Sequence, residues 1–263
     1  MARSATIDLY DAIAPIYDEW QSWNGMTPFA RVAAAKVAPL LDREAATAAA
    51  RGRDRPALLD LGCGTGTMLA DVRRAQPPST SAWRLAGVDT SAGMLAVAQA
   101  KLKAIAGDVL WARAGLDTLP FAAAFDVCTV FYDTLNHLPD EHALARAFGA
   151  VAAALRPGGL LVFDVTSRQG FEEWWDSTNR FSGTGWSMLV DARFDDANGI
   201  ATGRVTFERA GAARRFVIQE RYFARDEIAA ALAAAGFRVE AQEAWSPFPI
   251  GGLGKAWWVA RLG

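Results

Sequence analysis

Three glycines at alternate positions, Gly62, Gly64 and Gly66, follow directly on a short apolar run that ends near Asp60. Glycine tolerates positive φ angles and lets a ligand approach the backbone without meeting a Cβ atom. A helical pattern begins at once, over residues 68–74. The free N–H groups and the dipole at a helix N-terminus favour polar or anionic ligands. The stretch therefore predicts a nucleotide-type binding site at a strand-to-helix turn.

A second acid stands at the end of the next predicted strand, which runs from Trp83 to Asp89. Asp89 lies 23 residues beyond Gly66, close to the offset at which an acid accepts hydrogen bonds from ribose hydroxyls. Capping of the following helix by Asp89 or Thr90 is the structural alternative. The spacing favours contact with a ribose.

Residues 60–66, Asp-Leu-Gly-Cys-Gly-Thr-Gly, resemble the first motif of class I S-adenosyl-L-methionine (SAM) dependent methyltransferases. Residues 90–98 resemble the second motif, in which the side chain at the Met94 position packs under adenine. The resemblance implies SAM as cofactor and S-adenosyl-L-homocysteine (SAH) as product. The cofactor contacts that it implies are Asp60, Gly62, Gly64, Thr65, Gly66, Asp89, Thr90, Met94, Gly115, Leu116, Phe131 and Tyr132.

The adenine contact departs from the family pattern. Many relatives place an acid at the Gly115 position, whereas the nearest acid here is Asp117. Either Asp117 substitutes for it, or backbone groups of residues 114–116 contact the adenine.

The loop at residues 131–140 follows a predicted buried strand and resembles the matching loop of glycine N-methyltransferases and amino-sugar N,N-dimethyltransferases. In a doubly wound sheet such a loop lies at the ligand-binding edge. The resemblance makes His137 a catalytic base or substrate partner, and a structural histidine is the alternative. Tyr17 lies in a segment that resembles the N-terminal cofactor cover of small-molecule methyltransferases, or it simply packs on the core.

Candidate substrate contacts are more dispersed. Thr166 stands where glycine N-methyltransferases carry an arginine that binds the amino-acid carboxylate, so glycine is not the expected substrate unless Arg168 takes that role. Asp133 and Asp164 both follow strand ends, but two carboxylates without a third ligand are weak evidence for a metal, and we expect none. The predicted substrate contacts are Trp20, Asn136, Arg168 and Trp175.

The order of the predicted elements indicates an α/β fold: a Rossmann-like, doubly wound, seven-stranded mixed sheet with a β-rich antiparallel insertion after strand 5. We expect cap helices and the SAM-binding core in residues 1–166, and the last helix and strands of the core in residues 224–263. The insertion, residues 167–223, contains three strand-like runs, and Asn198-Gly199 predicts a hairpin between the first two. It would form a lid or a dimer surface.

Composition narrows the function further. The net charge of −2, with both signs interspersed, gives no basic patch for nucleic acid. The first residues lack an apolar signal core, and no run is long enough to span a membrane. We therefore expect a cytoplasmic protein without membrane contact, which acts on a small-molecule acceptor and can form a homodimer. The two cysteines, Cys63 and Cys128, fall in predicted buried segments and are expected to pack as free thiols.

These observations predict a SAM-dependent methyltransferase that acts on an amine or hydroxyl of a small metabolite, with N-methylation favoured. An NAD-dependent oxidoreductase would share the sheet and Asp89, but its fingerprint reads G-x-G-x-x-G. A non-catalytic SAM-binding protein is the second alternative.

Overall fold

The computed structural model describes residues 5–53, 55–75, 83–103, 109–247 and 254–263. The surface loop expected at residues 76–81 and most of the expected loop at 245–254 lie outside the described residues. Seven strands form the central sheet in the order β10-β11-β5-β4-β1-β2-β3. β11 pairs antiparallel with both neighbours, and the pairings among the other five strands are parallel. The strands are β1 (Ala57–Leu61), β2 (Arg84–Asp89), β3 (Val109–Arg113), β4 (Phe125–Val130), β5 (Leu155–Thr166), β10 (Phe237–Trp245) and β11 (Lys255–Leu262).

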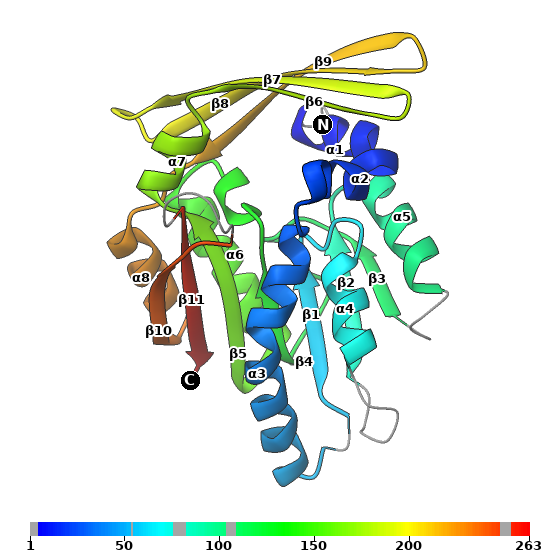
Figure 1. The fold of residues 1–263 in the computed structure, drawn as a ribbon. Coiled ribbons are helices and arrows are strands. Elements are labelled where there is room, and N and C mark those ends of the chain that lie inside the picture. Colours follow the sequence, from blue (N-terminus) through cyan, green and yellow to red (C-terminus); the bar gives the residue numbers. More distant parts are fainter. Residues whose placement is uncertain (1–4, 54, 76–82, 104–108, 248–253) are drawn as a thin grey trace.

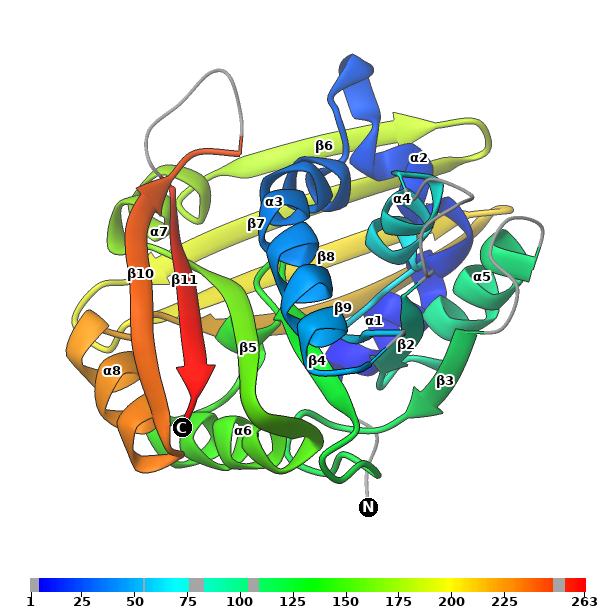
Figure 2. The ribbon, with the colours of Figure 1, turned by 90° about the horizontal axis from the view of Figure 1, so that it is seen from below.

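Helices cover both faces of this sheet, because alternate side chains of each strand point to opposite sides. Leu58 packs with α3 (Phe29–Ala50), α4 (Thr67–Ala75) and α5 (Ala92–Lys103). Its neighbour Leu59 belongs to the opposite core, which contains α6 (Glu141–Ala154) and α8 (Arg225–Ala234). Figures 1 and 2 show the resulting helix–sheet–helix layers, and the predicted doubly wound α/β fold is confirmed.

A second, antiparallel sheet lies across the edge of the first at which β1 and β4 end (Figure 1). Its strands are β6 (Thr178–Gly183), β7 (Trp186–Asp195), β8 (Ile200–Arg209) and β9 (Ala212–Arg221), and α7 (Arg168–Trp174) precedes it. The predicted hairpin is confirmed, with Gly199 at a φ of +66°. The sequence analysis missed β6, since its side chains are mostly exposed and show no apolar alternation.

Short helices at the N-terminal side connect the two sheets. They are α1 (Ala5–Ile13), η1 (Ala14–Ile16), α2 (Tyr17–Gln21) and η2 (Trp23–Gly25), so the break predicted at Pro15 is confirmed. Ile13 and Ile16 pack in one cluster with Met94 of α5 and with Met188 and Phe207 of the second sheet. The N-terminal helices thus lie between the second sheet and α5.

Two local patterns in the sequence differ from the structure. Pro39 indicates a possible break in the helical stretch of residues 28–50, but α3 is continuous through it, because Pro39 and Ala35, whose carbonyl loses its N–H partner, both lie on the exposed side of the helix. Residues 156–159 contain a Pro-Gly-Gly run that is typical of a turn, but they form an irregular start of β5. There the register to β4 shifts and Gly158 adopts a φ of +73°.

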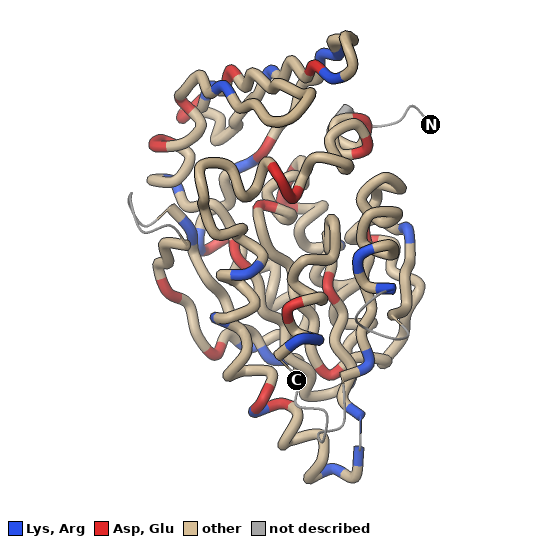
Figure 3. Tube along the Cα trace, turned by 45° about the vertical axis from the view of Figure 1, so that its right-hand side comes forward, with Lys and Arg blue, Asp and Glu red and all other residues tan. Residues whose placement is uncertain are grey.

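Lys and Arg are interspersed with Asp and Glu over the described part of the trace (Figure 3). Cys63 and Cys128 are buried free thiols, as predicted. Within the described ranges, the helices are all too short or too polar to cross a lipid bilayer.

Candidate cofactor and acceptor site

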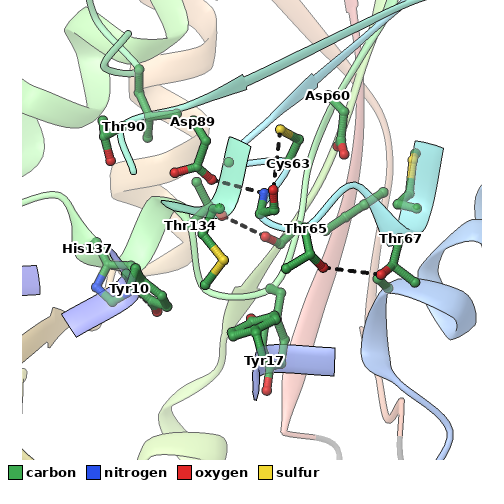
Figure 4. Close-up of a pocket in the computed structure, with 18 of the residues that line it drawn as sticks. Tyr10, Tyr17, Asp60, Cys63, Thr65, Thr67, Asp89, Thr90, Thr134 and His137 are labelled. Atoms are coloured by element: carbon green, nitrogen blue, oxygen red, sulfur yellow. Dashed lines mark hydrogen bonds between the residues drawn. The ribbon is translucent and has the colours of Figure 1, made fainter. Parts of the chain in front are cut away.

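A pocket of about 360 Å³ opens where β1, β2 and β4 end, beneath α1 and α2. This is the edge of a parallel sheet at which ligands bind in doubly wound folds. The residues that line it come from the N-terminal helices, the glycine loop, the ends of β2 and β3, and the loop that follows β4 (Figure 4). Of the predicted site residues, those that line the pocket are Tyr17, Asp60, Gly62, Gly64, Thr65, Asp89, Thr90, Met94, Gly115, Leu116, Phe131, Tyr132 and His137.

The three glycines of the loop have different environments, although all adopt positive φ. A Cβ atom on Gly64 would lie in open space within the pocket, with nothing within 4 Å. A Cβ on Gly62 would lie 2.5 Å from the side chain of Thr134, and one on Gly66 would lie 2.8 Å from Leu102 of α5. Gly64 therefore faces the ligand space, whereas Gly66 permits close packing of the loop on α5 and does not line the pocket.

Asp89 lies beside the loop, and each oxygen of its carboxylate accepts a hydrogen bond from a backbone N–H group. Its Oδ2 accepts a hydrogen bond from the Gly64 N–H at 2.9 Å, and its Oδ1 accepts one from the Ser91 N–H at 2.8 Å. Burial raises the pKa of Asp89, and these backbone hydrogen bonds oppose that shift. A carboxylate has about four lone-pair sites, so acceptor capacity remains toward the pocket for the hydroxyls of a ribose.

The far end of the pocket suits a flat ring. Met94 of α5 is 2% exposed, and it and Leu116 both contribute apolar surface to the pocket. Gly115, on the loop after β3, lines the pocket together with Ala114 and Asp117. Asp117 and the backbone of residues 114–116 both border the pocket, so the structure is compatible with adenine recognition by either.

The N-terminal helices are fixed over the pocket by two aspartates that sequence analysis did not single out. Asp11 of α1 accepts hydrogen bonds from the Gly93 N–H at 2.8 Å and from the Ser91 hydroxyl at 2.5 Å. Asp18 of α2 accepts one from the Thr65 hydroxyl at 2.6 Å and forms an ion pair with Lys101 at 2.6 Å. Asp11 thus connects the cover to the start of α5, and Asp18 connects it to both the glycine loop and α5.

At the acceptor end, His137 and Tyr10 lie side by side (Figure 4). The Tyr10 hydroxyl lies 3.0 Å from Nε2 of His137, and the Tyr10 ring packs edge-on against Tyr17. Burial lowers the pKa of His137 and raises the pKa of both tyrosines. At neutral pH the imidazole is therefore uncharged, the form in which one nitrogen can accept a proton.

A buried lysine orders the loop that carries His137. Lys255 of β11 forms an ion pair with Asp133, and its Nζ lies 3.2 Å from Oδ2 of Asp164. Burial opposes each charge, but Lys255 keeps the pKa of Asp133 below its usual value, and the two carboxylates raise the pKa of Lys255. The acid pair weighed as a metal site thus surrounds an internal ammonium group. Tyr132 and Asp133 both adopt positive φ here, at 59° and 61°.

The four predicted substrate residues do not line the pocket. Asn136 is fully buried, where its side chain donates to the Arg221 carbonyl at 2.8 Å and accepts from the Thr166 N–H at 2.9 Å, so it joins β9 to β5. Arg168 forms ion pairs with Glu172 and Asp196 at the surface. The aromatic pair packs on neighbouring rings, Trp20 on Phe181 and Trp175 on Phe171.

The fold and this site define a Rossmann-like α/β protein with a pocket at the ligand-binding edge of its sheet. Residues 58–159 match the methyltransferase domain family. A candidate methyltransferase of Geobacillus sp. (strain WCH70) is 37% identical over 110 residues, which make up 42% of this chain and 42% of that protein. YqeM of Bacillus subtilis (strain 168), a second candidate methyltransferase, is 31% identical over 110 residues with the same two shares. The chain matches less than half the length of these curated relatives.

Solved structures extend the likeness to the whole chain. A SAM-dependent methyltransferase from Clostridium acetobutylicum ATCC 824 has a TM-score of 0.71 at 19% identity, over 97% of this chain and 99% of that one. The sugar N-methyltransferase KedS8 from Streptoalloteichus sp ATCC 53650 has a TM-score of 0.69 at 24% identity, over 94% and 92%. SAM-bound CalS10, an amino pentose methyltransferase from Micromonospora echinaspora, has a TM-score of 0.62 at 26% identity, over 87% and 91%.

Residues 58–159 thus match a methyltransferase domain, and the chain has the fold seen in SAM-dependent methyltransferases. The resemblance carried by residues 60–66 and 90–98 is confirmed.

Proposed function

We propose that this protein transfers the methyl group of SAM to an amine of a small molecule. The observation that carries the proposal is the convergence of Gly64, Asp89 and Met94 on one pocket that also contains an uncharged histidine, His137. The open space beside Gly64 fits a close-lying ligand, and Asp89 retains acceptor capacity for a ribose. These residues, with Leu116 on the other side of the ring space, would hold the cofactor.

Methyl transfer needs little covalent chemistry from the protein, so alignment and desolvation dominate the catalysis. SAM, when bound, supplies a methyl group already activated by its sulfonium. Tyr17 and Tyr132 enclose the reacting end of the pocket and exclude water from it. His137 accepts the proton of an acceptor that arrives as an ammonium ion, which exposes the nitrogen lone pair.

The charge of the pocket favours an amine acceptor over an acid. No Lys or Arg is found among the described residues that line the pocket. Four acidic residues do line it: Asp18, Asp60, Asp89 and Asp117. A carboxylate or phosphate on the acceptor would have no cationic partner there and would face acidic groups. The aromatic side chains Tyr10, Tyr17 and Phe29 offer faces for a cationic amine.

Two measurements test the proposal in sequence. Calorimetric titration with SAH is expected to give micromolar binding, and titration with NAD is expected to give none. NAD binding without SAH binding would instead establish the oxidoreductase. A tritiated-methyl assay with SAM then compares primary amines of sugar-like and aromatic compounds with the matching carboxylic acids and phenols. Transfer to amines alone is the expected result, and SAH binding without transfer to any compound would leave a SAM-binding protein.

A further inference from the structure

Both nitrogens of the His137 ring have a partner, one in the insertion sheet and one in α1. Nδ1 lies 3.3 Å from the carbonyl oxygen of Gln219 in β9, and Nε2 lies 3.0 Å from the Tyr10 hydroxyl. A carbonyl oxygen only accepts hydrogen bonds, so Nδ1 carries the proton in the neutral ring. Nε2 then holds the lone pair and accepts a hydrogen bond from Tyr10, which itself lines the pocket.

The next residue of β9 places a carboxylate at the same nitrogen. Oε1 of Glu220 lies 3.7 Å from Nε2 of His137. Glu220 is only 5% exposed, and within the described part of the chain its Oε2 has no hydrogen-bond partner. A buried carboxylate without full partners costs stability, so its retention at this position calls for a role beyond packing.

The surrounding charges leave Glu220 available to His137. Asp133, on the same loop as His137, is already paired with Lys255 of β11. Burial and the nearby Asp133 raise the pKa of Glu220 well above its usual value, and Lys255 opposes only part of that shift. A proton on His137 would bring a positive charge to within 3.7 Å of this carboxylate.

We propose that Tyr10, His137 and Glu220 form a proton relay between the acceptor and the insertion sheet. The inference rests on the amine methylation proposed above. Tyr10 gives its hydroxyl proton to Nε2 of His137 and takes a proton from the acceptor ammonium ion. The products are a neutral amine, an intact tyrosine and an imidazolium ion. Glu220 stabilises the imidazolium through charge, while the Gln219 carbonyl keeps the ring oriented.

The relay gives the insertion sheet a chemical role. Tyr10 and His137 line the pocket and are the members of the relay that contact the acceptor. Glu220 does not line the pocket and acts as a positioning residue. The second sheet supplies this part of the relay directly, since Glu220 extends to His137 from β9.

Nuclear magnetic resonance of histidine-labelled protein tests the relay without an acceptor. The chain contains two histidines, and the exposed His142 of α6 serves as an internal reference. In the wild type, the nitrogen shifts of neutral His137 are expected to show a proton on Nδ1 and none on Nε2. A neutral ring protonated on Nε2 would overturn the proposal, and this measurement needs no variant.

Substitution isolates the contribution of each partner. Glu220→Gln is expected to lower the pH midpoint of His137 titration by about one unit, because the carboxylate charge is lost at similar shape. Glu208→Gln, an exposed substitution on β8, is the matched control and should leave the midpoint unchanged. Tyr10→Phe should shift the Nε2 resonance of neutral His137, since that nitrogen loses its donor. An unchanged His137 midpoint in Glu220→Gln contradicts the relay.

SAH titration of the same samples separates the two proposals. Glu220→Gln is expected to bind SAH like the wild type, which also shows that the variant folds. Failure of the wild-type protein to bind SAH would overturn the proposed function, whatever the histidine titration shows. Normal SAH binding, together with an unchanged His137 midpoint in Glu220→Gln, would overturn only the proposed relay.

Discussion

Oδ2 of Asp89 accepts a hydrogen bond from the backbone N–H of Gly64 at 2.9 Å. The acid at the end of β2 thereby fixes the central glycine of the neighbouring loop, and the two residues form one wall of the pocket. Substitution of either should therefore affect ligand binding more than the fold.

Asp89→Asn should weaken SAH binding ten- to hundredfold, since hydrogen bonds to a charged group are worth about 1.5–3 kcal/mol. The amide keeps the size of the side chain but replaces one acceptor oxygen with a donor. Calorimetric titration measures the effect. Asp195→Asn, in the exposed hairpin of the second sheet, is the control and should bind SAH normally. Equal affinity in both variants would show that Asp89 is only a loop-stabilising residue.

Alanine substitution should separate the roles of two glycines in the loop. Both adopt positive φ, which costs an alanine about 1 kcal/mol or more. Gly66→Ala adds a clash 2.8 Å from Leu102, so it should lower the free energy of unfolding by about 1–3 kcal/mol more than Gly64→Ala. Gly64→Ala should weaken SAH binding more, because its methyl group enters the pocket. Urea unfolding and SAH titration of both proteins provide the comparison, and the reverse ranking in either assay contradicts this assignment.

Asp60 should impose a pH dependence on stability. Burial raises its pKa from 3.8 to about 7, so the folded state binds the proton more tightly than the unfolded chain. The free energy of unfolding should therefore fall as the pH rises from about 4 to 7 and level off above that range. The Asp60→Asn side chain can still accept a hydrogen bond from the Thr129 hydroxyl. This variant should flatten the slope and have a free energy of unfolding about 2 kcal/mol higher than the wild type at pH 8.

Urea unfolding at pH 5, 6, 7 and 8 measures the slope. Asp164, whose pKa burial raises to about 6, contributes a smaller slope below pH 6 in both proteins. The exposed Asp42→Asn serves as the control and should reproduce the wild-type curve. Parallel curves for Asp60→Asn and the wild type would mean that Asp60 is ionised in the folded protein.

Lys255→Met should destabilise the protein by about 3–5 kcal/mol, because it leaves Asp133 and Asp164 without their buried counter-ion. The folded-state pKa of Asp133 should then rise above its unfolded value, and the already raised pKa of Asp164 should rise further. Acidification to pH 5.5 should therefore restore part of the loss. Urea unfolding at pH 7.5 and 5.5 gives both values. Lys103→Met, at the exposed end of α5, controls for the loss of a positive charge. If Lys255→Met lowers the free energy of unfolding no more than Lys103→Met does, Lys255 does not stabilise the fold as proposed.

Features encoded by short-range pattern could be predicted from the sequence. The strand, glycine loop and helix around Gly64 each depend on residues within a few positions of one another. The position of Asp89 follows from a fixed offset along one β-α-β unit. The hairpin at Asn198-Gly199 has a turn signal of only two residues.

Features that depend on distant partners could not be predicted. Lys255 meets Asp133 across 122 positions of the chain, and Tyr10 meets His137 across 127. Asn136 was expected to contact a substrate, but its side chain is buried and hydrogen-bonds to the backbone of Arg221 and Thr166. No local pattern reports such pairings, because the sheet topology alone creates them.

The place of β11 in the sheet has a consequence for synthesis on the ribosome. β1, β2 and the glycine loop emerge early and can pair as soon as they leave the exit tunnel. β11 lies between β10 and β5 and carries Lys255. The ribosome therefore adds 122 residues after Asp133 before the counter-ion of Asp133 has been synthesised. A nascent chain would therefore build its cofactor half first, and the loop bearing His137 would acquire its final conformation only when translation has passed Lys255.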